Sequence, residues 1–215
     1  MTTMTDPSST TPRFDPVFGA QATFRGVLDA MSRPGTICRL PAADPTAPLP
    51  ATRFALAVLQ TLLDHEVGFA VVAPQNDAIA ESAAAYLRET TGSRVVPIAA
   101  ADYVLALGPL PADLPTALKR GTPAYPDESA TLLCLVPSFD TDASDSSVTL
   151  SGPGVPGTRT LRLPGLTPAD LASLAAANAE PPLGIDLILV DPAGHLICLP
   201  RSTHVGRGSS VERRE

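Results

Sequence analysis

The segment PPLGIDLILVDPAGHLICLPRSTHV, residues 181–205, contains two apolar runs joined by a turn sequence. The runs, Gly184–Val190 and His195–Leu199, are rich in Ile, Leu and Val, and the Asp-Pro-Ala-Gly sequence between them is typical of a turn. This pattern predicts a β-hairpin in the protein core. One acidic residue, Asp186, lies inside the first run.

Upstream of this hairpin, apolar runs alternate with helical patterns. The runs VGFAVVA, 67–73, and TLLCLVP, 131–137, are uninterrupted, as expected of strands that are covered on both faces. Helical spacing follows Asp15, a predicted N-cap, and places four apolar residues on one face: Phe24, Val27, Leu28 and Met31. Strands interleaved with helices predict an α/β protein, a three-layer α/β/α sandwich with a mixed sheet.

Hydrophobic residues make up 44% of the 215 residues, which is sufficient for a sizeable core. The Ser-, Thr- and Pro-rich residues 1–13 and the polar residues 206–215 have little to bury, so we expect two disordered tails. We find no internal repeat and no domain boundary between them. We therefore predict one α/β domain over residues 14–205.

The chain is acidic, with a formal net charge of −7. It has no basic run that would neutralise the phosphates of a nucleic acid, and an acidic surface disfavours anionic membranes. The sequence shows neither a signal peptide nor an uninterrupted apolar stretch of about 18 residues. We therefore expect a cytoplasmic protein that binds neither nucleic acid nor membranes.

The sequence offers little for metal or nucleophilic catalysis. Its three cysteines are widely spaced, and we expect all of them to be reduced and buried: Cys38, Cys134 and Cys198. The three histidines form no metal-binding motif, so no metal site is expected. No G-x-S-x-G nucleophile motif occurs either.

The segment LPRSTHV, residues 199–205, carries the most reactive group of side chains. Arg201 can bind a phosphate group through two N–H donors, Thr203 adds a hydroxyl group, and His204 can donate or accept a proton. We predict that these three residues bind a ligand. A structural ion pair or a subunit contact fits the segment at least as well.

The acidic residue inside the hairpin also needs an explanation. Because a buried carboxylate requires a partner, we expect Asp186 to pair with an arginine such as Arg25 or Arg201. Such a pair could belong to a ligand site, but a purely structural role is equally compatible with the sequence.

Two glycine-containing segments are candidates for phosphate binding through backbone N–H groups. SGPGVPGT, 151–158, matches no Walker A motif, and its prolines remove two donors, so a turn joining two strands, Val148–Leu150 and Arg159–Leu163, is the better interpretation. Gly121 and Thr122 could also present an amide or a hydroxyl group. We favour a simpler reading, in which Gly121 follows the end of a short helix.

Five segments occur in a fixed order from about residue 14 to residue 205: FRGVLDAMSRPG (24–35), GTPAYPDESATLL (121–133), SGPGVPG (151–157), PLGIDLIL (182–189) and LPRSTHV (199–205). Their order and spacing resemble the motifs of the PhnH family. Five motifs in register make a chance match improbable. The resemblance covers nearly the whole chain outside the predicted tails.

This resemblance implies a subunit of the carbon–phosphorus lyase core complex, with PhnG, PhnI and PhnJ as partners, in alkylphosphonate degradation. The early step in that system joins the phosphonate to the ribose of MgATP and gives alpha-D-ribose 1-methylphosphonate 5-triphosphate. In that system PhnJ carries out the radical cleavage of the carbon–phosphorus bond. The chain is therefore expected to support catalysis or structure, not to be catalytic alone, and to form a homodimer when isolated. The resemblance leaves open a contact with a phosphonate or a nucleotide within the complex.

The resemblance also implies a fold similar to that of the pyridoxal-phosphate-dependent transferases, but without the cofactor, so none is expected. Two alternatives remain. The chain could be a self-sufficient transferase, either nucleotide-dependent or of the pyridoxal type, for which Lys119, the single lysine, is the only Schiff-base candidate. It could also be a homodimeric scaffold that holds no small molecule.

Overall fold

The computed structural model describes residues 14–41, 43, 47–111, 113–139 and 147–207. The predicted tail at 1–13 lies outside these residues, and so does 208–215. Residues 206 and 207, which we assigned to the C-terminal tail, instead belong to a strand that ends at Arg207.

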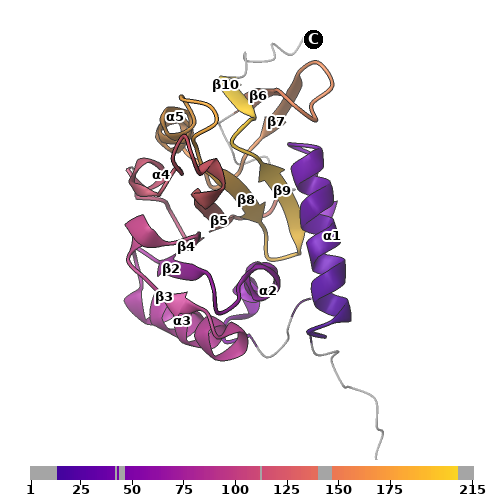
Figure 1. The fold of residues 1–215 in the computed structure, drawn as a ribbon. Helices are drawn as coiled ribbons and strands as arrows, with labels where there is room; N and C mark the ends of the chain where they lie inside the picture. The colour runs from indigo at the N-terminus through magenta and orange to yellow at the C-terminus, as the bar shows by residue number, and fades with distance from the viewer. Residues whose placement is uncertain (1–13, 42, 44–46, 112, 140–146, 208–215) are drawn as a thin grey trace, which may run out of the picture.

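Helices and strands alternate along most of the chain (Figure 1). The helices are α1 (Phe18–Ser32), α2 (Arg53–Leu62), α3 (Asp77–Thr91), α4 (Leu114–Ala117) and α5 (Pro168–Ala177), with short 3-10 helices η1 (Pro50–Thr52), η2 (Ile98–Ala100) and η3 (Pro126–Glu128). The strands are β1 (Cys38–Arg39), β2 (Gly68–Val72), β3 (Arg94–Val95), β4 (Tyr103–Leu107), β5 (Thr131–Leu135), β6 (Ser147–Ser151), β7 (Arg159–Arg162), β8 (Asp186–Val190), β9 (His195–Leu199) and β10 (His204–Arg207).

Seven strands form one mixed sheet in the order β1-β9-β8-β5-β4-β2-β3. The neighbours β8, β5, β4, β2 and β3 are parallel, whereas β9 lies antiparallel between β8 and β1. The predicted hairpin at the C-terminus is therefore confirmed as β8 and β9, and so is the mixed sheet. We call the end of the sheet where β4, β5 and β8 begin its amino end, and the opposite end its carboxyl end.

The two faces of the large sheet are covered differently. Buried side chains of α1, α2 and α3 pack on one face, and those of α4, α5 and strand β6 pack on the other. Strand β6 belongs to a second, three-stranded sheet in the order β10-β6-β7, which lies beside α5 in Figure 1. The predicted α/β/α sandwich is thus correct for the sheet and one helical layer, but the other layer is part helix and part sheet.

The second sheet arises from a predicted hairpin and one unpredicted strand. The hairpin, β6 and β7 joined by the glycine-rich turn 151–158, is confirmed. Strand β10 pairs with β6, which places His204 opposite Ser151. The pattern of its four residues is too short and too polar to predict a strand, because the strand depends on its pairing with β6.

Helix α1 differs from its prediction in the face that it buries. Asp15 accepts the backbone N–H groups of Val17 and Phe18 at 2.8 Å each, as expected of a cap, but the regular helix begins only at Phe18, with Val17 as its N-cap residue. The helix packs on α2 and β9, and its buried residues are Thr23, Val27 and Ala30. Phe24 and Leu28, which we placed on one apolar face with Val27 and Met31, are 44% and 51% exposed. The apolar stripe is wider than the side that its neighbours cover.

The cysteines also differ in part from expectation. Cys134 and Cys198 are buried within the sheet, but Cys38 is only half-buried, and its thiol lies 3.4 Å from the carboxylate of Asp29. All three are free thiols. Within the described residues, no helix has the length and apolar character needed to cross a membrane.

Candidate functional site

Asp186, the acidic residue in the hairpin, lies at the amino end of the sheet, where β8 begins and β9 ends. The backbone N–H of Arg201 donates to Asp186 Oδ1 at 2.8 Å. Our expectation that Asp186 pairs with an arginine side chain is therefore corrected: Arg201 is the partner, but through its backbone amide. Arg25 is exposed on α1, and no bond joins it to Asp186 in the described part of the chain.

The guanidinium group of Arg201 is directed to another part of the chain. Its Nη1 donates to the backbone oxygen of Pro126 and to the hydroxyl oxygen of Ser129, both in the segment that includes η3 and leads into β5. Arg201 therefore ties the end of the β8–β9 hairpin to this segment. Both contacts use Nη1, and the other N–H groups of the side chain have no acceptor among the described residues.

Close packing behind Arg201 explains a glycine and an asparagine of the sequence. Gly184 has a φ of +149°, and a Cβ there would lie 2.6 Å from Asn178 Oδ1 and 3.0 Å from Arg201 Cβ. The side chain of Asn178, at the end of α5, accepts the N–H of Ile185 at 2.8 Å and donates to its carbonyl oxygen at 3.2 Å. These contacts fix the backbone that leads into Asp186.

The three predicted ligand-binding residues lie in different surroundings. Arg201 is half-buried, whereas Thr203 is 4% exposed and its hydroxyl group has no hydrogen-bond partner in the described structure. His204 is exposed at the start of β10. The turn from Pro200 to Thr203 is closed by a backbone hydrogen bond of 2.8 Å. The fold therefore does not gather the three side chains into one shared cluster of contacts.

The glycine-rich turn packs on two other motif segments. A side chain at Gly152 would clash with the carbonyl oxygen of Ser202, and one at Gly154 with that of Ser32 at the end of α1. Arg159, after the turn, donates to the carbonyl oxygen of Pro34 at 3.4 Å and to the Thr36 hydroxyl group. The turn is therefore a packing element, as the turn interpretation predicts.

Gly121 is not the residue after a helix end, because α4 ends earlier, at Ala117. Its φ is +76°, and a Cβ would lie 2.8 Å from the carbonyl oxygen of Pro126. The same loop is held by Arg201 through Pro126. The five motif segments thus meet around the end of β9, although they are far apart in the sequence.

A second polar group at the amino end was not predicted. The ammonium group of Lys119 donates to Asp102, and the other carboxylate oxygen of Asp102 accepts the N–H of Gly68 at 2.6 Å. Burial, with the nearby charges of Asp102 and Asp186, raises the pKa of the Tyr103 hydroxyl group. The sequence signalled Lys119, but nothing local indicated that Asp102 would bind it.

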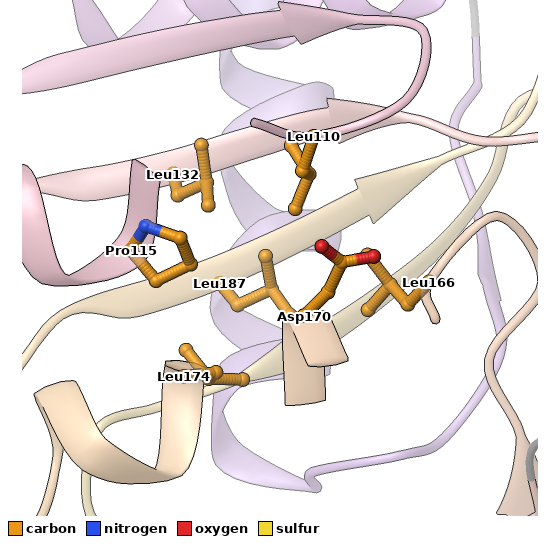
Figure 2. Close-up of a pocket in the computed structure, with 7 residues that line it drawn as sticks. All are labelled: Leu110, Pro115, Leu132, Leu166, Asp170, Leu174 and Leu187. Atoms are coloured by element: carbon orange, nitrogen blue, oxygen red, sulfur yellow. The ribbon is translucent and has the colours of Figure 1, made fainter. Parts of the chain in front are cut away.

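A small cavity lies under α4 and α5, with Asp170 at its edge (Figure 2). Its volume is about 10 Å³, which is the space of about one water molecule, and most of its wall is leucine. The Asp170 carboxylate accepts the backbone N–H and the hydroxyl group of Thr167, both at 2.7 Å. This cavity is far smaller than a ligand pocket.

The fold and this network define a class: a mixed α/β protein whose motif segments meet around an arginine at the amino end of its sheet. Comparison with known proteins gives the family. The model of the family described as "Bacterial phosphonate metabolism protein (PhnH)" matches residues 13–206. The chain belongs to the PhnH family, and the resemblance seen in the sequence is confirmed.

Two relatives have related names. The chain is 34% identical over 197 residues to the "Alpha-D-ribose 1-methylphosphonate 5-triphosphate synthase subunit PhnH" of Rhizobium meliloti (strain 1021), which covers 90% of this chain and 93% of the relative. It is 32% identical over 186 residues to the "Putative C-P lyase subunit protein HtxG" of Stutzerimonas stutzeri, which covers 86% of this chain and 85% of the relative. Both names describe subunits in the metabolism of phosphonates or of carbon–phosphorus bonds.

Proposed function

We propose that this chain is a subunit of the carbon–phosphorus lyase core complex in alkylphosphonate degradation, with PhnG-, PhnI- and PhnJ-type partners, in the cytoplasm. In this complex it supports the MgATP-dependent formation of alpha-D-ribose 1-methylphosphonate 5-triphosphate. The observation that carries the proposal is the family match over residues 13–206, together with the subunit names of both relatives.

The role that the geometry favours is structural or catalysis-supporting. Nη1 of Arg201 donates hydrogen bonds to its own chain, at Pro126 and Ser129. Its remaining N–H groups, with the hydroxyl group of Thr203 and the exposed His204, are the groups that we assign to a phosphonate or nucleotide within the complex. The kinship with the pyridoxal-phosphate transferase fold stays a prediction.

An apolar stripe on and near α1 is the surface that we assign to a partner subunit of the complex. Its five residues are exposed by between 44% and 73%: Val17, Phe18, Phe24, Leu28 and Ile37. A subunit must bury part of its surface against its partners, and clustered apolar residues mark such contacts. A homodimer of the isolated chain is a separate expectation, and light scattering of the purified protein tests it.

Co-expression with the three partner subunits, followed by affinity purification, tests the assembly. We expect the chain to co-purify, and the double variant Phe24→Glu/Leu28→Glu to be lost from the complex because it puts two charges into the contact. The control is Val95→Glu, on strand β3, where Val95 is also 52% exposed. A chain that elutes alone contradicts the assembly; a double variant that co-purifies normally contradicts only the role of the stripe.

Phosphorus NMR of the reconstituted reaction tests the role. With MgATP and methylphosphonate, we expect the complex to form the ribose triphosphate product, and much less of it when this chain is omitted. Product formed by this chain without partners would instead support the self-sufficient transferase.

A further inference from the structure

The turn between β8 and β9 holds a carboxylate–imidazole pair at the carboxyl end of the sheet, remote from Arg201. Asp191 directly follows β8 and is fully buried. Its Oδ2 lies 2.9 Å from His195 Nδ1 and accepts the N–H of Phe139 at 3.4 Å. Its Oδ1 accepts the N–H groups of Ala193 and His195 at 2.9 and 2.8 Å. Both oxygens of the Asp191 carboxylate therefore take part in hydrogen bonds within the protein.

This arrangement fixes the orientation of the imidazole ring. Because Nδ1 is bonded to Asp191, the ring presents Nε2 as its free nitrogen. The side chain of His195 is 23% exposed, and Nε2 is neither buried nor bonded to a described residue. A turn needs only the carboxylate to hold its backbone, so the oriented and accessible Nε2 is a feature that the turn does not require.

An arginine lies opposite His195 on the neighbouring strand. In the antiparallel pairing of β1 with β9, Arg39 is directly opposite His195. Opposite residues of such a pair project from the same face, with Cβ atoms about 5 Å apart. Arg39 is exposed, and its guanidinium group has no partner in the described part of the chain.

We propose that His195 and Arg39 form a binding site for a tetrahedral phosphorus oxyanion, the phosphonate or phosphate group of a ligand. The guanidinium group donates N–H groups to two oxygens of such an anion. His195 Nε2 accepts from the P–OH group of a monoprotonated anion, or donates to an oxygen when it carries a proton. A carboxylate anion has no such donor and has only two oxygens, both of which the guanidinium group can occupy, so it makes fewer of these contacts than a phosphorus oxyanion. The inference rests on the proposed function only for this choice of ligand class.

Nitrogen NMR of the His195 ring in the full chain tests the site. We expect methylphosphonate and inorganic phosphate to shift the Nε2 signal with saturation, and acetate not to do so. Unequal responses to the two phosphorus anions would show which of them the site prefers. His195→Gln removes the signal, so its affinity is measured by calorimetry.

Two variants and one control complete the test. Arg39→Gln and His195→Gln should each weaken binding at least about tenfold. Arg94→Gln, at an exposed arginine on β3 with the same change of charge, should leave the affinity unchanged. Because Arg39 is exposed, its variant does not threaten the fold. No shift with either phosphorus anion, an equal shift with acetate, or full affinity in Arg39→Gln overturns the proposal. Assembly with partner subunits is measured separately, so the two proposals fail independently.

Discussion

At the scale of the residue, the side chain of Arg201 forms hydrogen bonds that hold two distant parts of its own chain together. Its partners lie 75 and 72 residues away in the sequence. Its backbone N–H also donates a hydrogen bond to the carboxylate of Asp186, the acidic residue in the hairpin. A half-buried guanidinium group is well suited to this task, because the two N–H groups of its Nη1 reach two acceptors at once.

Replacing Arg201 should therefore affect stability. We expect Arg201→Ala to lower the free energy of unfolding by about 2 kcal/mol, because the variant loses two hydrogen bonds made by a charged group. Arg201→Lys should recover less than half of this loss, since the ammonium group of a lysine ends one bond short of the position of Nη1. Urea unfolding measures both. Ser129→Ala, which removes only one acceptor, is the matched control and should cost less.

The opposite outcome would also be informative. Unchanged stability in Arg201→Ala, with loss of product formation in the complex, would show that Arg201 acts on a ligand and not on its own chain.

At the scale of the element, the start of α5 is built entirely from contacts between neighbouring residues. Thr167 accepts the N–H of Asp170 at 3.2 Å, Asp170 accepts the N–H of Thr167 at 2.7 Å, and Pro168 occupies the first turn. Reciprocal capping of this kind is local, so sequence spacing reveals it. Helix α1 is the contrast: its cap was predictable, but its buried face was not.

Removing the cap of α5 should cost a typical amount. We expect Thr167→Ala to lower the free energy of unfolding by about 1 kcal/mol, because the N–H of Asp170 loses its acceptor. Thr167→Ser keeps the hydroxyl group and should remain close to the unaltered protein. Chemical unfolding of the three proteins side by side measures the difference. Equal losses in both variants would mean that the threonine methyl group, and not the cap, stabilises this helix end.

At the scale of the whole molecule, two thiols in the core of the large sheet contribute to the pH dependence of stability at alkaline pH. Burial raises the pKa of the thiols of Cys134 and Cys198 far above the usual range. In the unfolded chain these thiols titrate near pH 8.5, as free cysteines do. The folded protein therefore keeps both protons at a pH where the unfolded chain releases them.

The sign follows from this difference. The stability contributed by each thiol is complete below about pH 8.5 and falls by about 1.4 kcal/mol per pH unit above it. We expect the free energy of unfolding, measured in urea with a reductant, to fall steeply between pH 9 and pH 10. Cys134→Ala/Cys198→Ala should be less stable at pH 7 but should show a clearly shallower decline. An identical slope in the double variant would contradict this account.

The sequence by itself determined the features that depend on neighbouring residues. Uninterrupted apolar runs specify strands that both layers of a sandwich cover, a Thr-Pro pair specifies a helix start, and a glycine-rich stretch specifies a hairpin turn. The same local patterns, in register over the chain, identified the family. These signals survive because backbone conformation and hydrophobic periodicity act over a few residues.

Tertiary structure alone decided which groups meet. The exposure of Phe24 and Leu28 depends on where α2 and β9 lie, not on the helical period of α1. The partners of Arg201, the bond between Lys119 and Asp102, and the alignment of Arg39 with His195 each join separate strands or loops. Such contacts depend on strand order and chain crossing, which no local pattern encodes. The sequence of segment 181–205 predicts a buried hairpin and indicates the family. The fold places the hydrogen bonds of Arg201 at the open end of this hairpin and the oriented imidazole of His195 at its turn.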